Sequence, residues 1–350
     1  MKRYYTRACN FYYGSESKAL LRKKKSLPLN GNNEISFDNI EIITRKSKKK
    51  ISINRLNELP RLLKKKIILD LKNITSKKKN FANLDFQKIP NIMGILNLTP
   101  DSFSDGGKFN SKKKGIDHAL RMFKIGADII DVGGESTRPG SSIINKKLEW
   151  NRIKKIISSI TKKIPISLDT RKSELMEKGI KYGVKIINDV SGLSHDLETI
   201  NILKKYKIPF IIQHTQGTPE NMQIKPSYKN ELLDIYDFFE NKIKFLRTIG
   251  IKHNNIIIDP GIGFGKNLKH NMNLISNISV FHSLGFPILV GNSRKKFIKD
   301  LTGKNDTKTR IGGTVASSIY LMMQGVQILR IHDVNELLQG VKVFKELFKN

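Results

Sequence analysis

Residues 92–107 read IMGILNLTPDSFSDGG, an apolar run that turns polar at Asn97 and then becomes rich in glycine. The apolar part does not alternate with polar residues, which is typical of a strand whose two faces are both buried. Strands of this kind belong to parallel sheets that helices cover. The stretch therefore predicts a buried parallel strand over 92–98, followed by a loop that carries polar side chains.

The same pattern recurs through the rest of the chain. Seven further apolar runs predict strands at 128–133, 165–169, 184–190, 209–214, 255–259, 287–291 and 326–332. Amphipathic segments between them predict helices, among them 115–125, 148–162, 230–249 and 309–324. Eight such units in about 260 residues predict an α/β fold, a (β/α)8 TIM barrel. An open doubly wound sheet is the alternative, but no G-x-G-x-x-G follows the first strand, which argues against its dinucleotide-binding form.

Polar residues lie at the end of almost every predicted strand, which is where a TIM barrel has its active site. They are Asn97, 135–138, Asp169, Asn188, Asp189, Gln213, His214, Asp259, 293–295, Arg330 and His332. A barrel without a ligand site has little reason to repeat this interruption. We therefore expect these side chains to line one common site.

One subset of these residues suits a heterocyclic ligand. The carboxylates and amide of Asp169, Asn188 and Asp259 can accept hydrogen bonds from several ring N–H groups. Lys295 can donate to a carbonyl or a ring nitrogen. Buried ion pairs inside the barrel are the alternative interpretation for the carboxylates.

A second subset suits a phosphate or diphosphate. The guanidinium groups of Arg138 and Arg330, together with His332 and the amide of Asn97, can bind phosphate oxygens. Asn97, Asp101 and Asp105 offer hard oxygen ligands for a magnesium ion that also touches the diphosphate. Surface salt bridges are the alternative for the arginines.

Other kinds of site are disfavoured. We find no Ser-His-Asp or Cys-His arrangement, and the single cysteine, Cys9, excludes an internal disulfide framework and a Cys-cluster metal site. Residues 101–107 and 133–140 are glycine-rich and predict mobile loops whose closure would exclude water. Simple tight turns are the alternative for both loops.

The formal net charge is +33, from 64 Lys and Arg against 31 Asp and Glu. Residues 1–90 hold 23 basic and 7 acidic residues, so their charge density is nearly three times that of the remainder. Many lysines stand in short runs, such as 23–25, 48–50, 64–66, 77–79 and 112–114. Because Lys, Ile and Asn share A/T-rich codons, genome composition explains this best. A nucleic-acid surface and attraction of anionic substrates are the alternatives.

No run approaches the roughly 18 apolar residues of a spanning helix, and no apolar stretch follows the basic start as in a secretory signal. The first 25 residues resemble an organellar transit peptide only weakly. We therefore expect a cytoplasmic protein without a membrane partner.

A boundary is predicted near Pro90, because the sequence before it is basic and irregular. Residues 1–89 would form a basic extension or small accessory domain, and 90–350 the barrel. Within the extension, 40–43 predict a strand and 56–71 predict a helix interrupted at Pro60. We assign it no chemistry.

Seven motifs resemble one family, the dihydropteroate synthases, in order along about residues 90–348. Residues 93–107 (MGILNLTPDSFSDGG) resemble its first signature, and 131–140 (DVGGESTRPG) resemble its second. The others are SLDT at 167–170, INDVSG at 187–192, DPGIGFGK at 259–266, SRK at 293–295 and RIHDV at 330–334. Any one motif is weak, but seven in register are highly specific.

The resemblance implies a pterin-binding TIM-barrel transferase of folate biosynthesis and a target of sulfonamides. It would join 6-hydroxymethyl-7,8-dihydropterin diphosphate to 4-aminobenzoate, giving 7,8-dihydropteroate and pyrophosphate. The diphosphate would leave with carbocation character at the pterin carbon, and the amine would then attack. The resemblance also implies Mg²⁺ as cofactor and a homodimer, with no nucleic-acid partner.

The resemblance further implies roles for individual residues. The pterin would be held by Asp169, Asn188, Asp259, Phe264 and Lys295. The diphosphate would be held by Asn97, Thr137, Arg138, Arg330 and His332, with the metal at Asn97. Phe103, Pro139 and Lys296 would bind the aminobenzoate. Asp101, Asp105, Arg138 and Lys295 would be the catalytic residues.

Two residues depart from the family pattern. Lys296 stands where Ser or Arg is common after Lys295, so the contact to the aminobenzoate carboxylate and to sulfonamides is open. Thr215 stands where a larger residue such as Met is common, which leaves the wall of the pterin pocket open.

Three rival functions remain. A methyltetrahydrofolate-to-corrinoid methyltransferase shares the strand-end Asp and Asn, but has no use for the diphosphate cluster. The others are a pterin-binding paralogue of weak activity, which the retained loops argue against, and a nucleic-acid-binding protein on a barrel scaffold. The chain has no recognisable nucleic-acid module.

Overall fold

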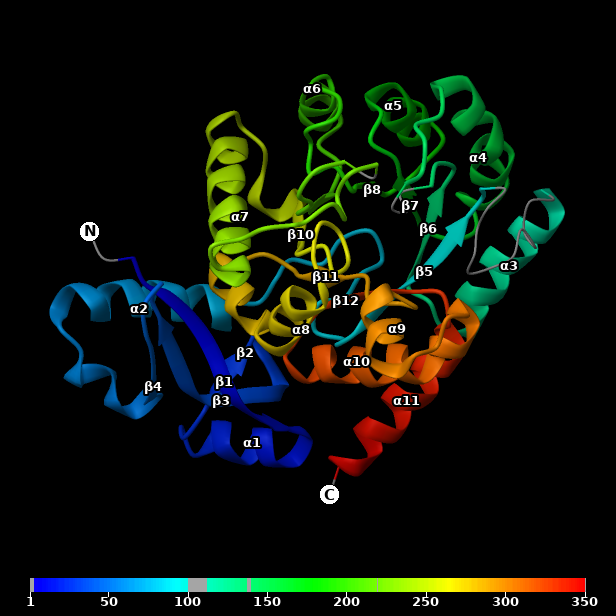
Figure 1. Ribbon diagram of the computed structural model, residues 1–350. Coiled ribbons are helices and arrows are strands. Elements are labelled where there is room, and N and C mark those ends of the chain that lie inside the picture. The colour runs from blue at the N-terminus through cyan, green and yellow to red at the C-terminus, as the bar shows by residue number, and fades with distance from the viewer. Residues whose placement is uncertain (1–2, 100–111, 137–139, 219, 350) are drawn as a thin grey trace.

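The structure is a computed structural model that describes residues 3–99, 112–136, 140–218 and 220–349. Its larger part is a ring of eight parallel strands (Figure 1). The strands are β5 (Asn91–Asn97), β6 (Ile129–Gly133), β7 (Ile166–Asp169), β8 (Ile186–Asp189), β9 (Phe210–Gln213), β10 (Ile256–Asp259), β11 (Leu289–Val290) and β12 (Ile328–Ile331). Their order is β10-β9-β8-β7-β6-β5-β12-β11, and a bridge between Ile258 and Ile288 closes the ring. The TIM barrel is confirmed, and the open sheet is excluded.

Helices surround the strands. They are α3 (Lys112–Ile125), α4 (Lys146–Ile160), α5 (Ser173–Lys181), α6 (Thr199–Tyr206), α7 (Glu231–Thr248), α8 (Leu268–Ser276), α9 (Lys296–Thr302), α10 (Ile311–Met323) and α11 (Val334–Leu347), with short 3-10 turns η2 (His253–Asn255), η3 (Ile278–Leu284) and η4 (Thr307–Arg310). In α4, the buried Ile153, Ile156, Ile157 and Ile160 recur at the spacing that places them on one face. Asn145 begins this helix by accepting a hydrogen bond from the backbone N–H of Leu148 at 2.8 Å.

The inside of the barrel has an apolar floor. Its strand residues are Met93, Ile129, Ile186, Ile211, Ile257, Leu289 and Ile328, all at most 1% exposed. Because side chains alternate along a strand, the residue two positions later points into the barrel as well. On five strands that next residue is polar, namely Asp131, Asn188, Gln213, Asp259 and Arg330. The period of the strand thus stacks a polar layer directly above an apolar one.

The floor is completed by the segment that precedes β5. Leu84 and Phe86 are buried in the same cluster as the strand residues, and Phe81 packs edge-on against Phe86 with ring centroids 5.1 Å apart. The amide of Asn91 donates to the backbone oxygens of Asp85 and Lys88, both at 2.9 Å, and so holds the segment in place. Residues 81–86, which we call the plug, therefore close the lower end of the barrel, where the strands begin.

The N-terminal part is an antiparallel sheet with two helices. Its elements are β1 (Tyr5–Tyr13), α1 (Gly14–Arg22), β2 (Leu27–Leu29), β3 (Asn32–Ile43), β4 (Lys48–Ser52), η1 (Ile53–Glu58) and α2 (Arg61–Thr75). β3 is central, with β1 on one edge and β2 and β4 on the other. The predicted strand at 40–43 is the end of β3. The helix predicted over 56–71 is divided at Pro60 into η1 and α2, as the proline required.

This sheet packs on the side and lower end of the barrel, near α7, η3 and α10 (Figure 1). The Ser279 hydroxyl donates to the backbone oxygen of Ala8 at 2.9 Å. The Tyr13 hydroxyl donates to the oxygen of Met323 at 2.8 Å, and the Tyr5 ring meets Tyr236 edge-on. Apolar residues of both parts form one continuous buried cluster. The N-terminal part is thus docked on the barrel.

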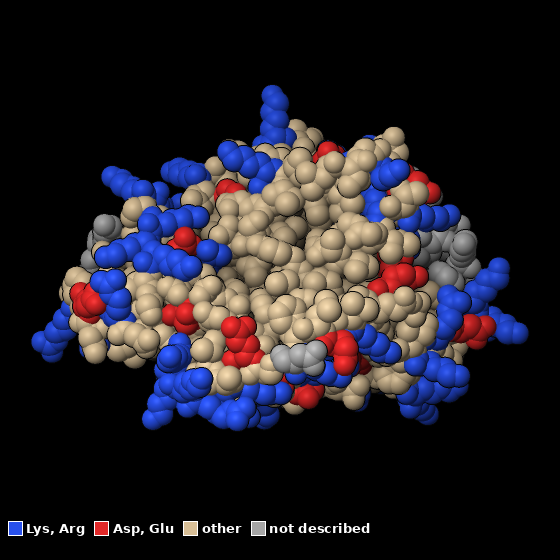
Figure 2. Space-filling view, turned by 90° about the horizontal axis from the view of Figure 1, so that it is seen from below, with Lys and Arg blue, Asp and Glu red and all other residues tan. Residues whose placement is uncertain are grey.

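The positive charge is not gathered into one patch on the face shown in Figure 2. On the face shown in Figure 2, Lys and Arg side chains lie around the periphery with Asp and Glu among them, and uncharged residues occupy the middle. This distribution is typical of compositional charge rather than of a groove that tracks a nucleic acid. Among the described residues, no helix is long and apolar enough to cross a membrane.

Closure of the barrel by the plug predicts that one buried aromatic residue contributes strongly to the stability of the protein. Phe86→Ala should lower the free energy of unfolding by about 3–5 kcal/mol, because it opens a cavity beneath the barrel floor. Urea denaturation followed by circular dichroism measures the change. Phe245→Ala is the matched control, since Phe245 on α7 is 47% exposed and should change stability little. Equal effects of the two substitutions would contradict the proposed closure.

Candidate active site

Four polar side chains are joined at the upper end of the barrel, where the strands end. Arg330 on β12 donates from Nε to Oδ2 of Asp131 at 2.6 Å and from Nη2 to Oδ2 of Asp169 at 2.7 Å. The amide of Asn188 donates to the same Asp131 oxygen at 3.0 Å. Arg330 thus links the end of β12 to carboxylates on β6 and β7, across the centre of the barrel.

Burial controls the protonation of these acids. Desolvation raises the pKa of Asp169, while the Arg330 guanidinium opposes that rise. Desolvation also raises the pKa of Asp259 to about 6, although its carboxylate accepts a hydrogen bond from the backbone of Gly261 at 2.8 Å. The pKa of the neighbouring Asp189 is likewise raised to about 6 by burial. The layer is therefore rich in acceptors that are poorly solvated.

Two of these acceptors are buried without a hydrogen-bond partner among the described residues. They are Oδ1 of Asp131 and Oδ1 of Asn188. Leaving a buried acceptor unsatisfied costs about 1–3 kcal/mol, and native structures contain few such atoms. Two such atoms leave this network short of hydrogen-bond donors among the described residues.

Lys295 and Phe264 form the opposite wall. The ammonium nitrogen of Lys295 lies 4.0 Å from the centroid of the Phe264 ring, within the range of a cation–π contact. Lys295 precedes the first turn of α9, and its charge acts on the nearby Asp259. Lys296 begins α9 and is exposed. The structure thus brings Asp259, Phe264 and Lys295 together.

Lys266 is a buried cation that the residue-by-residue prediction omitted. Its ammonium group donates to the oxygen of Phe264 at 2.8 Å and lies 3.1 Å from Nδ1 of His214. Desolvation lowers the pKa of Lys266 to about 7 and holds that of His214 well below its usual value. Lys266 therefore ties the loop after β10 to the end of β9 and positions Phe264.

Two glycines allow these loops to meet. Gly261 has φ +69°, and a Cβ there would lie 2.0 Å from the backbone oxygen of His214. Gly265 has φ +60°, and its Cβ would lie 2.6 Å from the oxygen of Gln216. Both close backbone approaches exclude a side chain. Thr215 lines a cavity of about 200 Å³ between these loops, together with Phe264.

Of the residues predicted to bind the diphosphate, the structure describes Asn97, Arg330 and His332. Nδ1 of His332 lies 3.0 Å from the Ser293 hydroxyl, and Arg294 donates from Nε to Asp333 at 2.9 Å. These contacts join the ends of β11 and β12. Asp101, Phe103, Asp105, Thr137, Arg138 and Pro139 lie outside the described residues.

Asn97 is placed near the carboxylate layer. In the strand register, Asn97 pairs with Gly133 and Gly133 pairs with Asp169. A Cβ built on Gly133 would lie 3.6 Å from Oδ1 of Asn97 and 3.4 Å from Cβ of Asp169, so these two side chains flank Gly133. The side-chain oxygen of Asn97 is one hard ligand of the type that Mg²⁺ prefers. Within the described parts of the chain, no three His, Cys, Asp or Glu residues are grouped to bind a metal.

A buried network of charged residues holds the second glycine-rich loop, which follows β6. Glu135 accepts from Arg171 Nε at 2.9 Å and from Lys172 at 2.8 Å, and it also accepts from the backbone N–H of Ile144 at 3.0 Å. Lys172 also pairs with Glu149 on α4, a residue that accepts from Thr170 at 2.7 Å. The four charged residues are at most 8% exposed. The network ties the loop after β6 to the one after β7.

Sequence reasoning missed several of these residues. Asp131 lies inside a strand rather than at its end, yet its spacing of two from Ile129 could have revealed it. Arg171 and Lys172 follow the SLDT motif, but their partners are 36 and 37 residues away. No local pattern identifies such pairs.

Comparison with known proteins decides the family. The model of a family described as pterin binding enzymes matches residues 93–332. The chain belongs to the pterin-binding enzyme family. Seven motifs predicted this membership, and the family model spans all but the last residues of the seventh.

Relatives in this family align over most of their length. A Synechocystis protein named dihydropteroate synthase is 39% identical over 267 residues, which is 76% of this chain and 92% of the relative. The Escherichia coli K12 dihydropteroate synthase is 39% identical over 256 residues, 73% of this chain and 90% of the relative. A crystal structure of the Yersinia pestis dihydropteroate synthase with a sulfonamide drug superposes with a TM-score of 0.73 at 37% identity, covering 76% of this chain and 97% of the other. The family model begins after the N-terminal sheet and the plug.

The buried network below the second loop predicts a specific loss of stability. Lys172→Met should lower the free energy of unfolding by about 3–5 kcal/mol, since it leaves the buried Glu149 without its cation and leaves Glu135 with Arg171 alone. Urea denaturation gives the value. Lys181→Met on α5 is the control, because that lysine is exposed and its pair with Glu177 should contribute under about 1 kcal/mol. A stability loss as small as that of the control would mean that the network is not held in the folded protein.

Proposed function

We propose that the upper end of the barrel joins 6-hydroxymethyl-7,8-dihydropterin diphosphate to 4-aminobenzoate, with release of pyrophosphate. Relatives that are 37–41% identical over about three quarters of the chain carry the name dihydropteroate synthase. They bear out the activity and transferase class predicted from the motifs. The observation that carries the proposal is the buried network of Asp131, Arg330, Asp169 and Asn188, with its two unsatisfied acceptors.

The pterin would lie on this network. Oδ1 of Asp131 and of Asn188 would each accept a ring or amino N–H, which satisfies the two buried oxygens. Asp169 and Asp259 offer further acceptors, and Lys295 offers the donor that a ring carbonyl or nitrogen needs. The Phe264 ring would bound the pocket beside Lys295. A ligand without this donor pattern would leave buried groups unpaired, so the pocket is selective.

Arg330 has a second task in this proposal. It neutralises Asp131 and Asp169, and 17% of its side chain is exposed. Together with His332, Thr137, Arg138 and Asn97, it would face the diphosphate. A fixed cation next to the leaving group stabilises the negative charge that develops there, without reorganisation of solvent.

Mg²⁺ would be held by Asn97 and the first loop, with Asp101 and Asp105, and when bound it would supply further neutralisation of the departing diphosphate. Phe103, Pro139 and Lys296 would hold the aminobenzoate, with the Lys296 ammonium toward its carboxylate. The amine of the aminobenzoate then attacks the pterin carbon as the C–O bond breaks, and it loses its proton. No side chain needs to act as a nucleophile.

Relatives have been crystallised with 4-aminobenzoic acid and with 7,8-dihydropteroate, both from Xanthomonas albilineans. These complexes support the same two ligands here. We propose further that the protein works as a homodimer in the cytoplasm. We also propose that residues 1–89 form an accessory unit, whose last part is the plug, and that 90–350 form the catalytic barrel.

The first test measures synthesis directly. Asp169→Ala and Arg330→Ala should each lower kcat/KM by about 100-fold or more, because each removes a charged group from the site. Pyrophosphate release and dihydropteroate formation from the two substrates with Mg²⁺ measure this loss. Asp117→Ala on the exposed face of α3 is the control and should keep full activity. Unchanged turnover in both site variants would remove the network from the mechanism.

The second test uses the pKa of Asp259, which burial raises to about 6. An ionised carboxylate is the better acceptor for N–H groups, so pterin diphosphate should bind about tenfold more weakly for each pH unit below about 6. Folding has the opposite dependence: because the unfolded chain loses this proton at lower pH, stability falls as pH rises from about 4 to 6.

Calorimetric titration of pterin diphosphate, without aminobenzoate, between about pH 5 and 7 measures the slope. Asp259→Asn should bind more weakly and should lose this part of the slope, while Asp189→Asn should retain it. Asp189 is the matched acid, since its carboxylate is satisfied by Ser191 and by the backbone of Leu193. An Asp259→Asn variant with the full wild-type slope would contradict the assignment.

A further inference from the structure

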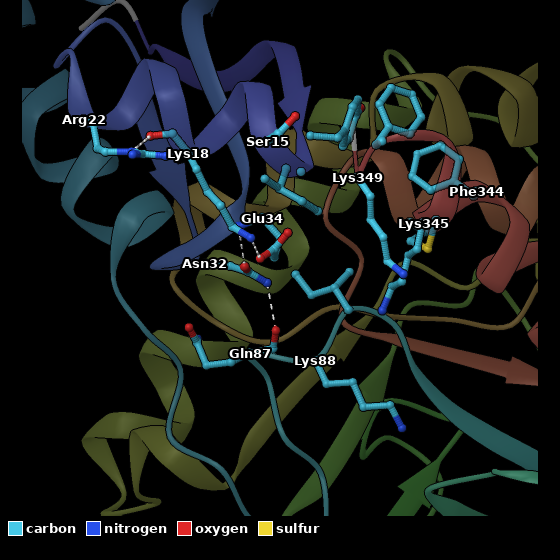
Figure 3. A pocket seen from close by; sticks show the side chains of 16 residues that line it. Ser15, Lys18, Arg22, Asn32, Glu34, Gln87, Lys88, Phe344, Lys345 and Lys349 are labelled. Atoms are coloured by element: carbon cyan, nitrogen blue, oxygen red, sulfur yellow. Dashed lines mark hydrogen bonds and ion pairs between the residues drawn. The ribbon is translucent and has the colours of Figure 1, made fainter.

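A cavity of about 370 Å³ lies where the N-terminal sheet meets the barrel helices α10 and α11 (Figure 3). Both ends of the chain contribute to it, through β1, α1 and β3 on one side and the end of α11 on the other. Its volume is within the range of small-molecule binding sites. It lies apart from the polar layer of the barrel and shares no lining residue with it.

The wall of this cavity is apolar. It is formed by Tyr13, Ile35, Ile89, Met322, Phe344 and Phe348. The rings of Phe344 and Phe348 lie 4.7 Å apart, and Tyr13 meets them at 5.7 and 5.2 Å. A hydrogen bond from the Tyr13 hydroxyl to Met323 and another from the backbone of Ser15 to the oxygen of Phe348 hold the two sides together. The wall is therefore rigid and ready for an apolar body.

The rim of the cavity is cationic. It carries Lys18, Arg22, Lys88, Lys345 and Lys349, against a single acid, Glu34, so the lining residues sum to +4. Glu34 pairs with Lys18, and Lys88 pairs with Asp128 at 2.5 Å. Lys349 pairs with the exposed Glu346, which is a weak attachment in water. Figure 3 shows the side chains of Lys88, Lys345 and Lys349 among those that line the cavity.

Two neighbouring cations repel each other unless an anion lies between them. Desolvation lowers the pKa of Lys345, and the charge of Lys88 lowers it further. An anion at this rim would relieve both effects. The combination of an aromatic wall and a cationic rim matches a molecule that is apolar at one end and anionic at the other.

We propose that this cavity binds a small amphipathic organic anion, with its apolar body against Tyr13, Phe344 and Phe348 and its carboxylate or phosphate at Lys345 and Lys349. Because both parts of the chain line the cavity, the ligand would bridge them and strengthen the docking of the N-terminal sheet. Residues 1–89 thereby acquire a role as half of a binding site. The inference does not depend on the activity of the barrel.

Binding is tested with the full chain and the fluorescent anion 8-anilinonaphthalene-1-sulfonate. We expect one site from which decanoate and decyl phosphate displace the dye, whereas neutral 1-decanol does not. The better of the two competitors identifies the head group. Lys345→Glu with Lys349→Glu should weaken binding about tenfold or more, because two attractive charges become repulsive. Lys342→Glu is the control on the same helix, outside the cavity, and should bind as wild type.

A second variant tests the apolar wall while the charges stay intact. Phe348→Ala should weaken decanoate binding severalfold, through lost apolar contact. Dihydropteroate synthesis should stay normal in every variant, which also shows that the proteins are folded. Equal affinity in the charge-reversed and wild-type proteins would overturn the proposal, as would displacement of the dye by 1-decanol as effectively as by decanoate.

Discussion

The alternation of side chains along a strand is the constraint on which the site depends. In five strands an apolar residue of the barrel floor is followed two positions later by a polar residue, as with Ile129 and Asp131, or Ile328 and Arg330. The register pairs Asp169 with Asn188, whereas Asp131 pairs with Ser167 and Arg330 with Met93. Because the strands of a barrel are tilted and staggered, polar residues at different register positions still meet across its centre, where Arg330 binds Asp131 and Asp169. A shift of one residue in any strand would exchange the inward and outward faces and break the layer. The plug at residues 81–86 closes the end below, so the polar layer opens only toward the mouth.

Burying charged groups in this layer costs solvation free energy, and neighbouring groups in the protein offset part of that cost. Desolvation raises the pKa values of Asp169 and Asp259, which would tend to neutralise the acceptors. Arg330 counteracts this for Asp169, and the backbone of Gly261 does so for Asp259. Two acceptor oxygens still lack partners. Unsatisfied acceptors of this kind are typical of a site that is complete only when its ligand supplies the missing donors.

The parts of this structure differ in how far the sequence predicts them. The eight barrel strands were predicted because strands buried on both faces are continuously apolar. The N-terminal sheet was mostly missed, since its strands carry exposed charges. Residues 48–50 of β4 are three exposed lysines on the strand beside β3, which sequence analysis grouped with the lysine runs. Lysines of this kind protect a strand edge from pairing with other chains.

For the site, the motifs predicted polar residues that stand at strand ends. The structure gathers Asp169, Asn188, Asp259, Phe264 and Lys295 at one end of the barrel, as those motifs imply. It adds Asp131, Lys266 and the Glu135 network, whose importance arises from contacts between distant segments. Glu135 and Lys172, for instance, are joined only because the barrel places the ends of β6 and β7 side by side. Such contacts form only in the completed fold, so a local sequence pattern cannot predict them.

The positive charge acts on the whole molecule rather than on one contact. Both proposed substrates are anions, and a net charge of +33 would raise their concentration near the protein and speed their encounter with the mouth. This attraction needs no patch, which agrees with the scattered lysines of Figure 2. It is screened beyond about 8 Å at physiological salt, so it can guide a ligand toward the surface but cannot hold one. Retention requires cations fixed beside a desolvated surface, as Arg330 is in the barrel and as Lys345 is at the rim of the N-terminal cavity.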